Sequence, residues 1–149
     1  LELLSSDHEG FKLYNALEPK ADDLYVRKIK FSAMIGDSSD LDRVLRDNGI
    51  EILLVAGTKT NVCCESTARD ASMMEYRVAL LSDATATSTD EEHAAALNGF
   101  QISFGDVMTV DEATARLVSR SSRIAGRAQP PLPASPPSGG EEKERVEAG

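Results

Sequence analysis

The sequence EILLVAGTKTNVCCESTARDA, residues 51–71, decides the fold and the position of the candidate site. It begins with an apolar run, Ile52 to Ala56, that predicts a buried strand, and it continues through a glycine-bearing turn into a helix. Two adjacent cysteines, Cys63 and Cys64, fall in the expected first turn of that helix. The pattern therefore predicts thiol groups where a strand ends and a helix begins.

A helix N-terminus suits a cysteine that reacts as a nucleophile. Its unsatisfied backbone N–H groups and its macrodipole favour negative charge, so they favour a thiolate over a thiol. The same N–H groups can bind the oxyanion of a tetrahedral intermediate, as acyl transfer requires. Two buried structural cysteines are the alternative, because free cysteine is among the most buried residue types. Position alone leaves both interpretations open.

The composition is that of a single globular domain. The chain has 149 residues, of which 41% are hydrophobic, and a formal net charge of -9. This charge argues against nucleic-acid and anionic-membrane partners. The longest apolar run, Ile52 to Ala56, is far shorter than the ~20 residues of a membrane helix. Two adjacent cysteines do not form a spaced disulfide framework, so a reducing, cytoplasmic compartment is expected.

Strand and helix patterns alternate along the chain. Leu24 to Lys30 alternates apolar with charged residues and predicts a strand, and Tyr76 to Ser82 predicts a second apolar strand. Short apolar strands that alternate with helices indicate a parallel α/β sheet covered on both faces. Ligands bind at the carboxyl ends of the strands in such sheets. Cys63 and Lys28 are both expected at that edge.

Capping patterns predict where the helices begin and end. A hydroxyl residue stands three positions before an acidic residue at Ser39, Thr89 and Thr109, which predicts three capping boxes. Asn48-Gly49 and Asn98-Gly99 predict the ends of two helices. His93 lies among acidic residues and alanines and is interpreted as a surface residue. Glu65 and Arg69, one helical turn apart, predict an ion pair on a helix surface.

The segment GTKTNVCCESTARDA, with RKIKFSA and LRDNGIEILLVA before it and YRVALLSDATA after it, resembles the isochorismatase-like cysteine hydrolases. The resemblance covers roughly Asp23 to Leu117 and is greatest to the ureidoacrylate amidohydrolase branch. It implies a doubly wound parallel sheet in a Rossmann-like, three-layer fold. It also implies hydrolysis of a C–N bond in a small amide or ureido compound, through a thioester acyl-enzyme.

The resemblance assigns roles to residues of this sequence. The family nucleophile falls on Cys63, because it follows Thr60-Asn61-Val62, and Cys64 becomes a packing residue. The family lysine falls on Lys28, with Lys30 as the neighbour it could be confused with. A nearby ammonium favours the thiolate and stabilises charge during attack on a carbonyl.

The family oxyanion hole falls on two backbone amides, those of Lys59 and Cys63, with a cis peptide bond before Lys59. No cofactor is implied. Some members hold a metal with histidines and an acid, and this sequence shows no such cluster, so no metal is expected. A homo-oligomer is expected from the resemblance.

The resemblance implies a Cys-Lys-Asp triad, in which the aspartate follows the first strand of the fold. Asp7 and Asp22 lack a preceding strand pattern, so neither fits. Residues 1–125 therefore resemble the C-terminal portion of a hydrolase domain that lacks its first strand and general base. Residues 126–149, rich in proline, glycine and glutamate, are expected to be disordered. The alternative function is a catalytically inactive family member that acts as an oligomerisation or binding module.

Overall fold

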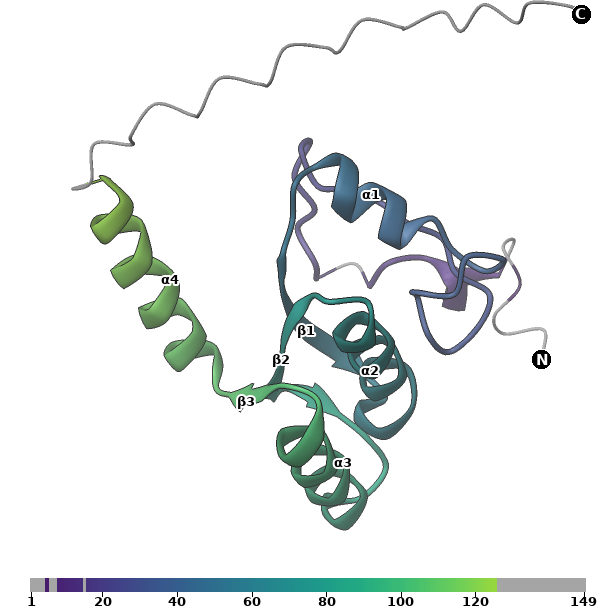
Figure 1. Ribbon diagram of the computed structural model, residues 1–149. Helices are drawn as coiled ribbons and strands as arrows, with labels where there is room; N and C mark the ends of the chain where they lie inside the picture. Colours follow the sequence, from purple (N-terminus) through teal and green to yellow (C-terminus); the bar gives the residue numbers. More distant parts are fainter. Residues whose placement is uncertain (1–4, 6–7, 15, 126–149) are drawn as a thin grey trace, which may run out of the picture. The chain divides into compact units, whose positions relative to one another are not determined.

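The computed structural model describes residue 5, residues 8–14 and residues 16–125 (Figure 1). The chain divides into two compact units, Leu1–Ala113 and Thr114–Gly149, and the first unit holds the sheet and the candidate site. The predicted tail, residues 126–149, lies outside the described residues.

Three parallel strands form the sheet, in the order β1-β2-β3. They are β1 (Ile52–Thr58), β2 (Arg77–Ala86) and β3 (Asp106–Met108). The pairing of β1 with β2 shifts register between Val55 and Gly57. Gly57 has a φ of 123°, which glycine tolerates because it has no Cβ. The strand is therefore irregular just before the turn that carries the two cysteines.

The helices of the described chain follow the predicted alternation with strands. They are η2 (Glu9–Phe11, a 3₁₀ turn), α1 (Leu41–Asp47), η3 (Thr60–Cys64, a π-helical turn), α2 (Glu65–Met73), α3 (Asp90–Ser103) and α4 (Val110–Ala125). Figure 1 shows α2 and α3 next to each other beside the strands. The parallel sheet with its helices confirms the predicted α/β class. No helix in residues 16–125 or in the shorter described stretches is long and apolar enough to span a bilayer.

Two of the three predicted helix caps are confirmed. The hydroxyl oxygens of Thr89 and Thr109 accept hydrogen bonds from the backbone N–H groups of Glu92 and Glu112, each at 3.2 Å. Each threonine satisfies one of the donors that a helix start leaves free.

The capping box predicted at Ser39 is wrong. The Ser39 hydroxyl accepts a hydrogen bond from the N–H of Leu41 at 3.1 Å. The Asp42 carboxylate pairs instead with Arg46 at 2.9 Å and accepts a hydrogen bond from the Tyr76 hydroxyl at 2.8 Å. Asp42 therefore pairs with Arg46, one helical turn away, and with the distant Tyr76, and does not form the predicted capping box with Ser39.

The helix end predicted at Asn98-Gly99 is also wrong, because α3 continues to Ser103. Phe100, one residue later, is fully buried in the core. A Cβ at Gly99 would lie 3.4 Å from the Arg69 guanidinium, at the limit of ordinary van der Waals contact. Burial of Phe100 favours continuing the helix and outweighs the local preference of Asn-Gly for a turn.

Each face of the sheet carries an apolar cluster. The larger cluster joins α1, α2 and α3 to the sheet and is formed by Met34, Leu45, Cys64, Ala68, Ala71, Tyr76, Val78, Leu80 and Phe100. The smaller cluster is formed by Ala79, Leu81, Met108 and Ala113. Side chains alternate between the two faces along a strand, so the neighbours Leu80 and Leu81 enter opposite clusters. The larger cluster lies beneath the turn that carries the cysteines.

Candidate active site

Cys63 lies in η3, the π-helical turn between β1 and α2. The sequence predicted the first turn of an α-helix, but the chain makes a wider turn in which the Cys64 N–H donates to the Lys59 carbonyl at 3.1 Å. Such π-turns are rare and are frequent at functional sites. Cys63 is half-buried, and its thiol follows the carboxyl end of β1.

Cys64 has a different environment from its neighbour. Its side chain is buried and belongs to the larger apolar cluster. Burial raises the pKa of the Cys64 thiol, and the adjacent Cys63 raises it further, while Lys28 acts in the opposite direction. Cys64 is therefore a packing residue that stays protonated at neutral pH.

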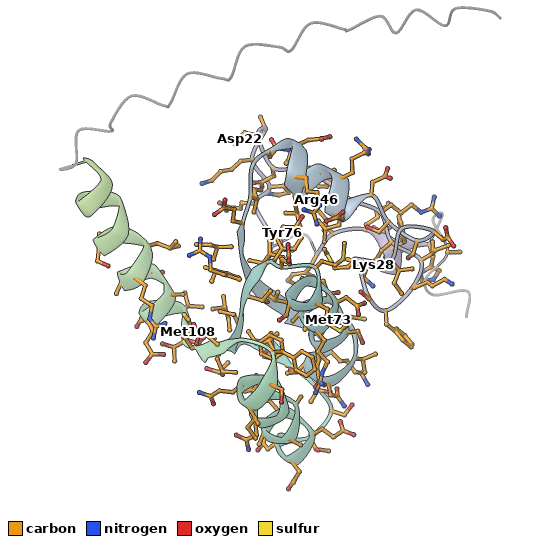
Figure 2. The ribbon with its side chains drawn as sticks, viewed as in Figure 1. Asp22, Lys28, Arg46, Met73, Tyr76 and Met108 are labelled. Atoms are coloured by element: carbon orange, nitrogen blue, oxygen red, sulfur yellow. The ribbon has the colours of Figure 1, made fainter. Side chains whose placement is uncertain are left out.

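Lys28 lies next to the thiol of Cys63. Its Nζ is 3.8 Å from the Cys63 Sγ, and it also donates to the carbonyl of Lys30 at 3.0 Å. In Figure 2, Lys28 is labelled on the N-terminal segment, far along the chain from α2. Among the residues that the structure describes, no carboxylate forms an ion pair with Lys28. The fold thus brings an ammonium to a thiol from 35 residues away in the sequence.

The strand predicted over Leu24 to Lys30 is wrong, although the segment does carry Lys28 to Cys63. The segment has no strand partner. The Ser38 hydroxyl instead accepts hydrogen bonds from the N–H groups of Ile29 and Lys30, at 3.0 and 2.8 Å. The Ser38 side chain therefore satisfies two backbone donors that a neighbouring strand would pair in a sheet.

Hydroxyl groups that the sequence analysis did not single out hold this segment in place. The Thr67 hydroxyl on α2 accepts a hydrogen bond from the N–H of Ala33 at 3.0 Å, and so attaches the segment to the helix that follows Cys63. Ser38 acts in the same way within the segment. A single serine or threonine has no local pattern that would reveal such a distant partner.

The peptide bond between Thr58 and Lys59 is cis, as the resemblance led us to expect. The ammonium of Lys59 donates to the Ser88 hydroxyl at 2.9 Å, so its side chain reaches the segment after β2. The backbone of Lys59 flanks η3, and its carbonyl accepts hydrogen bonds from the N–H groups of Val62 and Cys64 at 3.2 and 3.1 Å.

The interpretation of His93 as a surface residue is wrong. The side chain is half-buried on α3 and has a partner at each ring nitrogen. Its Nδ1 is 2.9 Å from the hydroxyl of Thr60, and its Nε2 is 3.1 Å from the carbonyl of Ser82. The Thr60 partner is 33 residues away, which explains why the sequence around His93 gave no sign of it.

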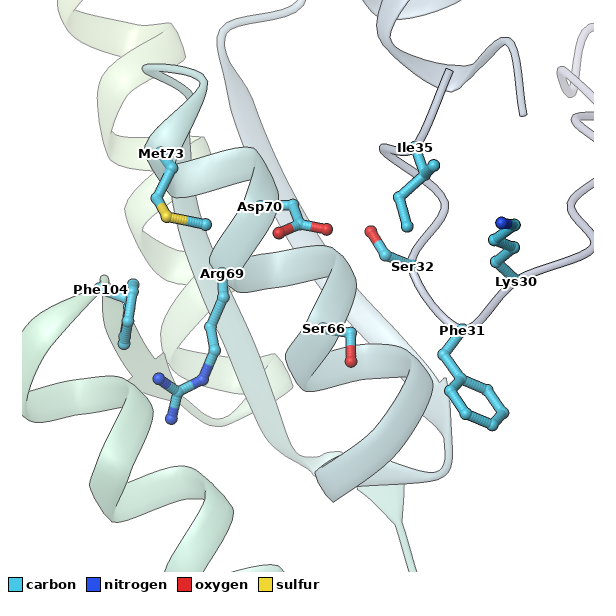
Figure 3. Close-up of a pocket in the computed structure, with 9 residues that line it drawn as sticks. All are labelled: Lys30, Phe31, Ser32, Ile35, Ser66, Arg69, Asp70, Met73 and Phe104. Atoms are coloured by element: carbon cyan, nitrogen blue, oxygen red, sulfur yellow. The ribbon is translucent and has the colours of Figure 1, made fainter. Parts of the chain in front are cut away.

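A groove of about 490 Å³ lies along the outer face of α2 (Figure 3). It is lined by Lys30, Phe31, Ser32, Ile35, Ser66, Arg69, Asp70, Met73 and Phe104. Lys30 is in this lining, whereas Lys28 and Cys63 are not. The predicted ion pair of Arg69 with Glu65 is confirmed at 2.6 Å, and the guanidinium also stacks 4.2 Å from the centre of the Phe104 ring. The groove is therefore separate from the lysine–cysteine pair.

The described part of the chain has no group of three or more histidine, cysteine or acidic side chains that could hold a metal ion. The lysine–cysteine pair has the chemistry of a nucleophile and its counter-charge.

Comparisons with known proteins identify relatives of this chain. Residues 2–112 match the isochorismatase domain family. The chain is 38% identical over 112 residues to ureidoacrylate amidohydrolase RutB of Pseudomonas savastanoi pv. phaseolicola, covering 74% of this chain and 45% of that relative. The chain thus spans about half the length of the curated relatives it matches.

Two solved structures are similar to most of this chain. A cysteine hydrolase from Pseudomonas syringae pv. phaseolicola 1448A matches with a TM-score of 0.75 and 34% identity, over 79% of this chain and 60% of that one. An isochorismatase-like hydrolase from Alkaliphilus metalliredigens matches with a TM-score of 0.68 and 39% identity, over 72% and 59%. With the family match over residues 2–112, which includes Lys28 and Cys63, this chain belongs to the isochorismatase family.

Proposed function

We propose that this chain carries the nucleophile of a cysteine-dependent hydrolase that cleaves a C–N bond in a small amide or ureido compound. The observation that carries the proposal is the 3.8 Å contact between the Lys28 ammonium and the Cys63 thiol, beyond the carboxyl end of β1. The similarity to proteins named ureidoacrylate amidohydrolase and cysteine hydrolase supports the reaction class.

In the proposed first step, the Cys63 thiolate attacks the substrate carbonyl carbon. A carbon–sulfur bond forms, and the carbonyl oxygen becomes an oxyanion. The Lys28 ammonium favours the thiolate before attack, because an opposite charge close by stabilises the ionised form. The backbone N–H groups of Lys59 and Cys63 are the proposed donors to the oxyanion.

In the second step, the tetrahedral intermediate collapses and the C–N bond breaks. The amine leaves with a proton, and a thioester to Cys63 remains. Water then attacks the thioester, which releases the acid and restores the thiol. The resemblance assigns the proton transfers to an aspartate, and among the described residues no carboxylate forms an ion pair with Lys28. The full reaction therefore requires a general base in addition to Lys28 and Cys63.

The chemistry also bears on compartment and assembly. Both cysteines are free, and oxidation would consume a thiolate nucleophile, so we propose a reducing, cytoplasmic location. A homo-oligomer remains a prediction, which sedimentation of the full chain would check.

The proposal is tested with the full chain, Cys63→Ala and Cys64→Ala. Each is incubated with ureidoacrylate and other small amides, while amine release and the intact mass of any acyl adduct are measured. We expect Cys63→Ala to lower the rate by about a thousandfold or more and to remove the adduct. Cys64→Ala is the matched control and keeps most of the activity. An acyl adduct that persists in Cys63→Ala, or one that is lost in Cys64→Ala alone, would contradict the proposal.

A further inference from the structure

Three consecutive residues before Cys63 are tied by their side chains to one distant segment. Lys59 donates to the Ser88 hydroxyl at 2.9 Å, Thr60 is 2.9 Å from His93, and Asn61 accepts from the Thr87 hydroxyl at 2.6 Å. All three partners lie between the carboxyl end of β2 and the first turn of α3. The segment from β2 to α3 therefore holds the start of the turn that presents the thiol.

Hydrogen-bond chemistry fixes the proton at one nitrogen of the His93 ring. The Ser82 carbonyl can only accept a hydrogen bond, so the His93 Nε2 that faces it at 3.1 Å carries the proton. In a neutral imidazole the other nitrogen, Nδ1, is then an acceptor. In that neutral form the hydroxyl of Thr60 donates to Nδ1. Thr60 is fully buried, which leaves its hydroxyl without bulk water as a competing partner.

The orientation of Thr60 affects Cys63 because both residues belong to η3, which begins at Thr60. Thr60 is the first residue of η3, and the carbonyl of the preceding Lys59 accepts hydrogen bonds from the N–H groups of Val62 and Cys64, on either side of Cys63. A rotation at Thr60 would therefore turn the backbone that aims the Cys63 thiol towards Lys28.

We infer that His93 is a positioning residue for Cys63, acting through its hydrogen bond with the buried hydroxyl of Thr60. This inference rests on the proposed function, in which Cys63 is the nucleophile. In this arrangement α3 contributes no group to the reacting atoms. It locks the turn from which the thiol projects, through the contacts of the His93 ring with the Thr60 hydroxyl and the Ser82 carbonyl.

The test measures the rate constant for alkylation of Cys63 by iodoacetamide, by peptide mass spectrometry on the full chain. The variants are Thr60→Val, which removes the hydroxyl at nearly constant volume, His93→Ala and the double variant. We expect each single change to alter the rate by about tenfold and the double change to add nothing further, as for two residues of one interaction. Thr60→Ser, which keeps the hydroxyl, and Glu91→Ala, on the exposed side of α3, keep the wild-type rate within about twofold.

Additive effects of the two single changes, or equal effects of Thr60→Val and Thr60→Ser, would overturn the inference. If the variants unfold, nitrogen NMR of the wild-type histidine decides, because a His93 in the Nδ1–H tautomer would also overturn it. The ratio of the alkylation rates of the variants to that of the wild type tests whether His93 positions Cys63. The absolute wild-type rate against a cysteine peptide tests the proposed nucleophile, so the two failures are distinguishable.

Discussion

The two faces of the sheet are packed to different depths. On one face, Leu80 and Phe100 are fully buried in a cluster that joins α1, α2 and α3 to the strands. On the other, Leu81 belongs to a smaller cluster with Ala79, Met108 and Ala113. Because Cys64 belongs to the larger cluster, the deep face anchors the turn that carries the half-buried Cys63. Cys63 therefore remains partly accessible to a small molecule, while Cys64 is packed in the core.

Leu80 and Leu81 offer the most direct comparison of the two faces, because they are neighbours on β2 and chemically identical. We expect Leu80→Ala to lower the free energy of unfolding by about 4 kcal/mol and Leu81→Ala by about 2 kcal/mol, since the deeper site loses more contacts and leaves a larger cavity. Urea denaturation of both variants measures this. Equal losses, or a larger loss for Leu81→Ala, would show that the faces contribute alike.

The helix caps sharpen the same comparison at a smaller scale. Thr89 caps α3, which places Ala96 and Phe100 in the core, whereas Thr109 caps α4, which contributes Ala113 to the smaller cluster. We expect Thr89→Ala to lower the free energy of unfolding by about 1 kcal/mol and Thr109→Ala by a few tenths, because fraying of α3 disturbs the deeper face. Thr→Ser at each position is the control, since it keeps the capping oxygen. A larger loss of stability for Thr109→Ala than for Thr89→Ala would contradict the claim that the face packed by α3 contributes more.

A pH-dependent contact ties α1 to the deep face. Hydrogen bonds from Arg46 and then from Tyr76 hold the pKa of Asp42 below its usual range. Figure 2 labels Arg46 and Tyr76 close together, and the guanidinium lies 5.3 Å from the centre of the ring. A carboxyl group with a lowered pKa stabilises the fold above its ordinary pKa, and this contribution is lost as the pH falls through the folded-state value.

Asp42→Asn should therefore reduce stability at neutral pH, with the difference from wild type shrinking below about pH 4. Denaturation at several pH values measures it, with Asp47→Asn on the same helix as the control. A difference that stays constant down to pH 2 would mean that charge on Asp42 does not stabilise the fold.

Local patterns in the sequence were sufficient for much of the fold. The apolar run from Ile52 to Ala56 lies within β1, and Thr89 and Thr109 cap helices as their spacing predicts. The predicted burial of that strand is wrong, because its side chains are half-buried or exposed. These features depend on residues a few positions apart, where periodicity and capping act. The rule that parallel strands present ligands at their carboxyl ends also led to Cys63 beside Lys28, although the segment with Lys28 is not a strand.

The rest of the site depends on partners that are distant in sequence. His93 meets Thr60 across 33 residues, and Thr67 meets Ala33 across 34. Such pairs form because the fold buries a polar group that must then find a partner. The alternation in Leu24 to Lys30 was misleading for a related reason, since the Ser38 hydroxyl takes the N–H groups that a strand would pair.

The most direct test of the central claim compares the alkylation rates of Cys63 and Cys64 by iodoacetamide at pH 7, in wild type, Lys28→Met and Lys30→Met. We predict that Cys63 reacts at least about tenfold faster than both Cys64 and a free cysteine peptide. Lys28→Met should bring it down to the peptide rate, while Lys30→Met should leave it unchanged. A Cys63 that reacts no faster than the peptide, or that depends on Lys30 instead of Lys28, would contradict a thiolate nucleophile paired with Lys28.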